Sequence, residues 1–256
     1  INVGANGANC LFAIPVNHKG AAILPENSSI EYDFSYVEEN NHTSLIHELT
    51  SVCYQGNQLP NFIITPTVKK LLHGSCRKPH FESPDGLALV DNILEKNHLD
   101  IDSRPSHLMM TGDQIYCDDV AGPTLLAIQQ IIDILGLYDE SIPSTEITNA
   151  SELLNHSDCF YQRHNILPKH NLNQSALNKL ISGKQQPIFT SVNAKNHLVT
   201  LAEVCAMYLL VWSPTLWAQT DLTDTQRIPQ SMRATYQKEL SIINDFVLSL
   251  SKVQRA

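Results

Sequence analysis

The sequence predicts an α/β fold that is preceded by a small β-rich domain. Short apolar or alternating runs, separated by Gly, Pro, Asn and Asp clusters, fill residues 1–68. A strand–helix–strand pattern follows over residues 70–111, and helical periodicity dominates the remainder. We therefore divide the chain into an N-terminal β domain, residues 1–68, and an α/β domain, residues 69–256.

Four short runs in the first domain have the character of strands. No helical period runs across them, so we expect a small antiparallel sheet or sandwich. The expected strands are Cys10–Val16, Ile30–Tyr36, Leu45–Tyr54 and Asn61–Thr65.

The strand–helix–strand unit begins at Lys70–Ser75, a strand-like run that ends at Cys76. Ser83 and Pro84 are typical of a helix N-cap and first helical position. The apolar residues of this helix recur at helical spacing: Leu87, Val90, Ile93 and Leu94. The chain returns through a second strand, His107–Thr111. Strands joined by a helical crossover are parallel, so both should end at one edge of a sheet.

Three further helices and one insertion complete the second domain. Leu125–Leu137 carries an apolar face, Leu201–Trp212 has the pattern of a buried helix, and Gln230–Lys252 is amphipathic. Between the first two, residues near 142–190 are rich in Asn, Ser, His and Lys. We expect a polar, loop-rich insertion there with short helices.

Composition excludes several classes of function. The 256 residues carry a net charge of −9 with few, scattered basic residues, which argues against a nucleic-acid partner. The longest apolar run, Val204–Trp212, is far too short to span a membrane. The six cysteines are widely separated, which indicates free thiols in a reducing compartment and hence a cytoplasmic location. The oligomeric state is left open.

The candidate site lies where the two expected parallel strands end. Cys76 follows the first, and Asp113 follows the second within the run Gly112–Asp119. Ligand sites in open α/β sheets lie at this edge. A thiolate beside a carboxylate suits a transition metal, and Tyr116 could add a phenolate oxygen. The simpler alternative makes Cys76 a buried apolar residue and Asp113 a turn former.

Two motifs at these positions resemble the PhoD-like alkaline phosphatases, within the calcineurin-like metallophosphoesterases. They are Gly-Ser-Cys-Arg-Lys-Pro-His at residues 74–80 and Gly-Asp-Gln-Ile-Tyr at residues 112–116. The resemblance implies a layered metallophosphoesterase-type sandwich and hydrolysis of phosphate mono- or diesters. It further implies that Cys76 and Tyr116 ligate iron and that Asp113 bridges two metals. The cofactors would be a transition metal, iron or zinc, and a second divalent ion, with calcium as one candidate.

The later ligand motifs of that family are missing from the sequence. Asn196-His197 matches one of them only superficially, so we expect the chain to be an N-terminal portion with part of the site, itself without activity. Arg77 could contact the phosphate of a small phosphorylated substrate, although a surface salt bridge is the simpler interpretation. Asp118 and Asp119 could support the metal or cap the helix that follows. The alternative function is an inactive protein of this fold that serves as an interaction or metal-binding module.

Overall fold

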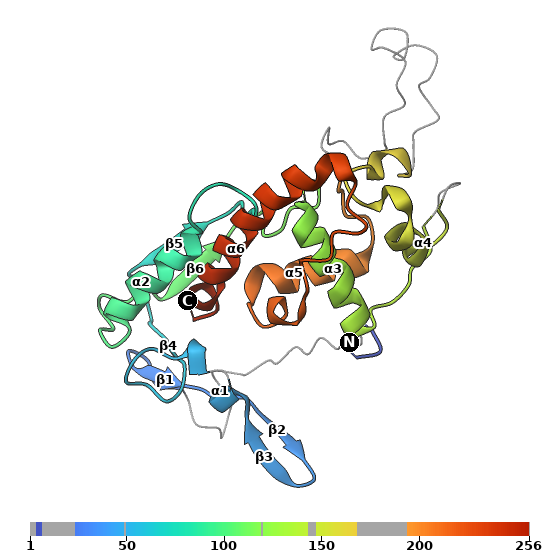
Figure 1. The fold of residues 1–256 in the computed structure, drawn as a ribbon. Helices are drawn as coiled ribbons and strands as arrows, with labels where there is room; N and C mark the ends of the chain where they lie inside the picture. The colour runs from blue at the N-terminus through green and yellow to red at the C-terminus, as the bar shows by residue number, and fades with distance from the viewer. Residues whose placement is uncertain are drawn as a thin grey trace.

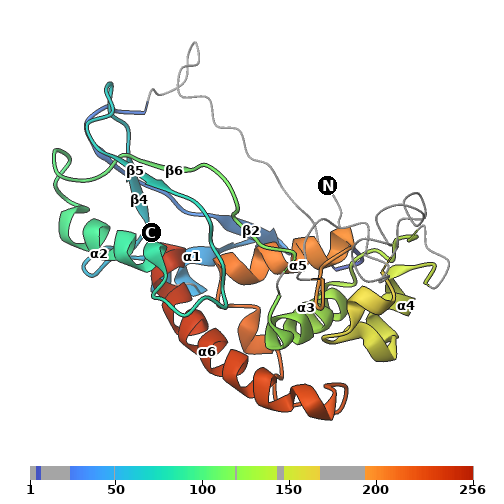
Figure 2. The same ribbon diagram turned by 90° about the horizontal axis from the view of Figure 1, so that it is seen from above.

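The computed structural model describes residues 4–6, 24–48, 50–118, 120–142, 147–167 and 194–255. Across these residues the chain is mixed α/β, with six α-helices and three two-stranded sheets. The long helix α6, Arg233–Arg255, runs diagonally across the molecule (Figure 1). Its C-terminal end lies beside α2, and its N-terminal part lies beside α3, in both views (Figures 1 and 2). The coarse α/β prediction is therefore confirmed.

The N-terminal region contains two antiparallel strand pairs. β1 (Ser29–Glu31) pairs with β4 (Asn61–Ile63), and β2 (Ser35–Glu38) pairs with β3 (Asn41–Ser44). The expected strand Ile30–Tyr36 is thus divided between two sheets, whereas the expected strand at Asn61–Thr65 is present as β4. The expected strand Cys10–Val16 lies outside the described residues.

The prediction of a strand at Leu45–Tyr54 is wrong. Helix α1 (Leu45–Glu48) and a 3₁₀ turn (Thr50–Val52) lie there instead. The backbone N–H of His47 donates to the hydroxyl of Ser44 at 3.3 Å. Ser44, the last residue of β3, therefore caps the start of α1. The apolar run was correctly identified, but the cap provided by the preceding serine favours a helical segment at its start.

The strand–helix–strand unit forms as predicted. β5 (Leu71–Gly74) and β6 (His107–Met110) are parallel and are joined through α2 (Gly86–Asn97). The cap of α2 is Asp85 rather than Ser83, because the Asp85 carboxylate accepts from the backbone N–H of Leu87 at 3.0 Å. Carboxylates suit this position as well as hydroxyls do, so the sequence offered two competing caps.

The core lies among α3 (Gly122–Leu135), α5 (Leu201–Trp212) and α6. α3 packs against both other helices, and α2 packs against α6. All three helices were predicted within a few residues of their observed bounds. The apolar face of α6 is buried as expected, through Tyr236, Ile243, Phe246, Leu250 and Val253.

The N-terminus of α3 is capped from α6 and not by a neighbouring aspartate. Glu239 accepts from the backbone N–H of Gly122 at 2.8 Å and from the hydroxyl of Tyr161 at 2.6 Å. A Cβ at Gly122 would collide with that hydroxyl. The N-cap residue, Ala121, contributes no side-chain bond, so the capping role suggested for Asp118 is not observed. Asp119 lies outside the described residues.

The described part of the expected insertion contains short helical segments, as predicted. α4 (Ala150–Asn155) is followed by 3₁₀ turns at Ser157–Cys159 and Arg163–Asn165. Much of this segment is buried, including Leu153, Phe160 and Arg163, so it contributes to the core more than its polar composition suggests. The five cysteines in the described residues are free, in agreement with the prediction. No helix in the described ranges is long and apolar enough to cross a lipid bilayer.

Candidate metal centre

The pairing of β5 with β6 continues past the strands and brings the two predicted motifs together. The backbone N–H of Cys76 donates to Gly112 O at 3.2 Å, and the N–H of Arg77 donates to Asp113 O at 2.8 Å. Cys76 and Asp113 are therefore neighbours across the ladder. They lie at the carboxyl ends of two parallel strands, where α/β sheets bind ligands.

Three side chains meet at one carboxylate oxygen. The Cys76 Sγ lies 3.5 Å from Asp113 Oδ2, and the Tyr116 hydroxyl donates to the same oxygen at 3.1 Å. Cys76 and Asp113 are exposed, and Tyr116 is half-buried. The hydroxyl of Ser75 lies 3.4 Å from the Cys76 sulfur. The structure thus brings together all three residues that the sequence selected as metal ligands.

The backbone is strained at two of these residues. Cys76 has φ 59° and Asp113 has φ 47°, both in the left-handed region. Asp tolerates this region better than most residues, but a cysteine there carries the ordinary cost of about 1–2 kcal/mol. At Gly112-Asp113 the left-handed conformation is thus adopted by Asp113 and not by the glycine, as expected of a turn former. Strained backbone of this kind is more frequent at functional sites, where it places a side chain for binding or catalysis.

The neighbouring side chains perturb the ionisation of Tyr116. A hydrogen bond with the Cys76 thiol, partial burial and the Asp113 carboxylate together raise the pKa of Tyr116. The phenol is therefore protonated at neutral pH when no metal is bound. Ligation by this oxygen would have to displace the proton.

The donor separations agree with those of ligands that share one transition-metal ion. Sulfur and oxygen ligands at about 2.3 and 2.0 Å from a tetrahedral ion lie about 3.5 Å apart, and two oxygen ligands lie about 3.3 Å apart. Among the described residues, no three His, Cys, Asp or Glu side chains are placed so that they could hold a metal ion together; the third donor proposed here is a phenol. Three protein ligands with a position left for water are typical of catalytic sites.

Arg77 lies beside the cluster but faces away from solvent. Its guanidinium pairs with Asp85, with Nη2 at 2.7 Å and Nε at 3.3 Å from Oδ2. It also stacks between the rings of Trp212 and Phe246, at 4.8 and 5.2 Å from their centroids. The salt bridge proposed as the simpler interpretation exists, but it is buried and not at the surface. The remaining nitrogen, Nη1, has no hydrogen-bond partner within the described residues, and Arg77 lines the groove beside the cluster.

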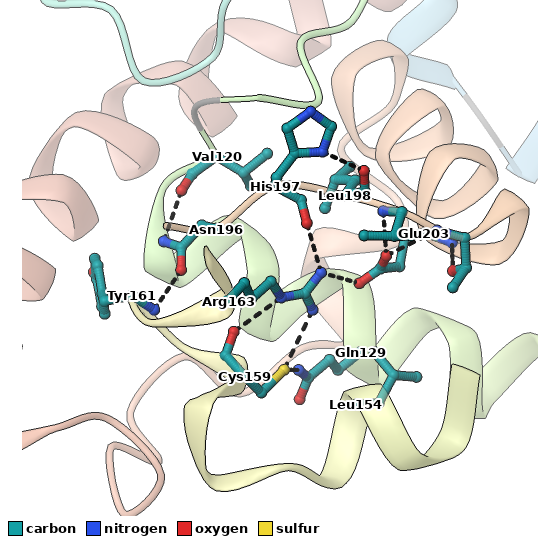
Figure 3. A network of polar contacts seen from close by, with 12 residues as sticks. Val120, Gln129, Leu154, Cys159, Tyr161, Arg163, Asn196, His197, Leu198 and Glu203 are labelled. Carbon is teal, nitrogen blue, oxygen red and sulfur yellow. Dashed lines mark hydrogen bonds and ion pairs between the residues drawn. The ribbon is translucent and has the colours of Figure 1, made fainter. Parts of the chain in front are cut away.

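A second polar site, which was not predicted, is fully buried around Arg163 and Glu203 (Figure 3). Arg163 Nη1 lies 2.6 Å from Glu203 Oε1 and donates to His197 O at 2.9 Å. Its Nε donates to Cys159 O at 2.9 Å, and its Nη2 to Cys159 Sγ at 3.2 Å. The one available signal was Thr200 three residues before Glu203, a capping-box pattern that forms as such at the start of α5.

Asn196 and His197 are structural in this arrangement. The Asn196 side chain accepts from Tyr161 N at 2.6 Å and donates to Val120 O at 2.8 Å. Figure 3 shows the ring of His197 directed away from Arg163, whose partner is the His197 carbonyl. These contacts give Asn196 and His197 a role in holding the backbone, independent of their superficial match to a ligand motif.

No protein-family model, curated protein or solved structure matches the chain. The resemblance to PhoD-like phosphatases therefore depends on the motifs at residues 74–80 and 112–116.

Proposed function

We propose that Cys76, Asp113 and Tyr116 form part of a transition-metal centre that hydrolyses phosphate mono- or diesters in the full-length protein. The observation that carries this proposal is the convergence of a thiol, a carboxylate and a phenol within 3.1–3.5 Å at two parallel strand ends. The left-handed backbone at Cys76 and Asp113 supports it, because such strain is often found at functional sites.

Each residue has a distinct role in this proposal. Cys76 and Tyr116 would hold iron or zinc, and Asp113 would bridge to a second divalent ion, with calcium as one candidate. Such ions activate a bound water and neutralise the phosphoryl oxygens. The remaining ligands would come from outside the described residues.

The surroundings of the cluster are compatible with a small phosphorylated substrate. A groove of about 1180 Å³ runs from Cys76 and Tyr116 along the face of α6. Lys78 lines it, with its ammonium 5.7 Å from the centroid of the Tyr116 ring. The groove therefore offers an ammonium for a phosphate and apolar walls for the esterified group, and the carboxylates of Glu82, Asp85 and Asp245 line it as well. Arg77 as a phosphate contact stays a prediction.

The finer fold also belongs to this proposal. We infer that β5, α2 and β6 are one unit of a larger layered sheet, as in metallophosphoesterases. Parallel strands occur almost only in sheets that are covered on both faces. Leu108 and Met109 on β6 are 41% and 51% exposed, which supports further layers or strands at this point.

A second candidate is a protein of this fold without catalytic activity. It is favoured by the hydrogen bonds among Cys76, Asp113 and Tyr116, which satisfy these groups without a metal. The Arg77–Asp85 pair favours it as well, because it occupies the nearest guanidinium.

Metal analysis and hydrolysis of p-nitrophenyl phosphate and bis-p-nitrophenyl phosphate by the full-length protein separate the two candidates. We expect bound iron or zinc and turnover in the wild type, and in Asp113→Asn loss of turnover with weakened metal binding. Asparagine tolerates the left-handed backbone, so this change removes the charge with little effect on the turn. Asp118→Asn is the matched control in the same loop and should keep both properties. A folded wild-type protein without metal or turnover would favour the inactive module.

A further inference from the structure

The segment Asn196–Leu198 forms hydrogen bonds to the loop that carries Asp113 and Tyr116 and to the residue where that loop enters α3. The backbone N–H of Leu198 donates to Cys117 O at 2.8 Å, directly after Tyr116. The Asn196 side chain donates to Val120 O at 2.8 Å, where the chain enters α3. These two bonds fix the backbone on both sides of residues 118–119.

This segment is itself held from several directions. Asn196 Oδ1 accepts from Tyr161 N at 2.6 Å, and Arg163 binds the carbonyls of its neighbours, Lys195 at 3.0 Å and His197 at 2.9 Å. Arg163 is anchored in turn by the buried carboxylate of Glu203 on α5 (Figure 3). Asn196 is 4% exposed and Leu198 is 2% exposed, so water does not compete for these bonds.

α5 contacts the same loop at a second point. The hydroxyl of Tyr208 donates to Gln114 Oε1 at 3.1 Å, between Asp113 and Tyr116 in the sequence. The loop is thus held by α5 at Gln114 and by the Asn196–Leu198 segment at its end. Its start is held by the β5–β6 ladder.

We propose that Asn196 is a positioning residue for the candidate metal centre. Through Val120 and the adjoining bond to Cys117, it fixes the loop Gly112–Asp118 so that Asp113 and Tyr116 meet Cys76. This inference rests on the proposed function for its role, but the contacts that carry it do not include the donor atoms. A purely structural role would affect stability alone, whereas a positioning role also affects the geometry of the loop.

The test compares Asn196→Ala with Leu153→Ala in the 256-residue chain. Leu153 is fully buried in α4 and packs in a separate cluster with Ile142, Ile147 and Ile166, so it serves as a destabilised control. Co²⁺ alone is titrated, and its affinity is read from the thiolate charge-transfer absorption at a temperature where both variants are folded. We expect Asn196→Ala to weaken Co²⁺ binding about 10- to 100-fold, as is usual for groups that orient ligands, and Leu153→Ala to leave it unchanged. Equal affinity in Asn196→Ala and wild type, or equal losses in both variants, would overturn the proposal.

If the wild-type chain binds no Co²⁺, the proposed metal centre is refuted, and hydrogen exchange then tests the positioning role of Asn196 by itself. Amides of residues 112–118 should then exchange faster in Asn196→Ala than in wild type or Leu153→Ala. Unchanged exchange in this loop would refute the positioning role. If Asn196→Ala does not fold, Asn196→Asp replaces it, because it keeps the oxygen that accepts from Tyr161 and loses the donor to Val120. The same expectations apply to it.

Discussion

Arg163 and Glu203 form a polar cluster in the interior, whereas Cys76, Asp113 and Tyr116 form one at the surface. In the interior, the ions are 0% exposed and each guanidinium nitrogen of Arg163 has a partner. At the surface, the Cys76 thiol and the Tyr116 hydroxyl share one oxygen of Asp113, and Cys76 and Asp113 have left-handed backbone. The interior cluster has the properties of a structural support. The surface cluster has those of a site that is costly to the fold and available to a ligand.

The largest difference between the two clusters should appear in stability. Glu203→Gln keeps a side chain that can complete the capping box with Thr200, but it removes the countercharge of a buried arginine. We expect the free energy of unfolding to fall by about 3–5 kcal/mol in urea titrations. The matched exposed pair is Glu82 with Lys238, and Glu82→Gln should change stability far less. Similar effects of the two substitutions would contradict the assignment of a supporting role to the interior pair.

A second test uses pH and the buried face of α6. Burial, followed by the charges of Asp221, Asp224 and Glu239, raises the pKa of Tyr236 from 10.0 to about 12. The unfolded chain loses this proton first, so stability should fall as pH rises from about 10 to about 12. One proton limits the slope to about 1.4 kcal/mol per pH unit.

Tyr236→Phe should flatten that slope in urea titrations between pH 9 and 12. It will also lose the hydrogen bond to Leu222 O, which lowers stability equally at every pH in this range. Part of the slope should persist, because burial raises the pKa of Tyr54 and Tyr161 as well. An identical slope in wild type and Tyr236→Phe would show that Tyr236 does not titrate in this way.

The smallest expected effect is a gain in stability, whereas the changes above lower stability. Cys76→Gly should raise stability by about 1 kcal/mol, because glycine adopts a φ of 59° without strain. Cys76→Ala keeps the Cβ and should show no such gain, which makes it the matched control. Thermal unfolding measures both variants. A loss of stability in Cys76→Gly would mean that the cysteine supports the fold, as the interior cluster does.

Local patterns predicted the parts of the molecule that depend on local physics. β5, α2 and β6 followed from the apolar runs and the helical period, and the parallel pairing then placed Cys76 beside Asp113. The errors arose at positions where the hydrogen bond of a single polar side chain determines the local structure. Ser44 caps a helical turn in an apolar run, and Asp85 replaces Ser83 as a cap.

The interior cluster could not be predicted in the same way. Arg163 and Glu203 are 40 residues apart in the sequence, and their contact depends on how α5 packs against the segment after α4. Likewise, nothing local connects Glu239 with the N-terminus of α3. Contacts of this kind follow from tertiary packing, which the periodicity of a single sequence does not specify.

Metal binding distinguishes the surface cluster from the interior one, and Co²⁺ absorption measures it. We predict that a single Co²⁺ binds the wild-type chain with a thiolate charge-transfer band. Cys76→Gly should remove the band while the protein stays folded, and Asp113→Asn should weaken binding. A wild-type chain with no such band, or a band that persists in Cys76→Gly, would contradict the account.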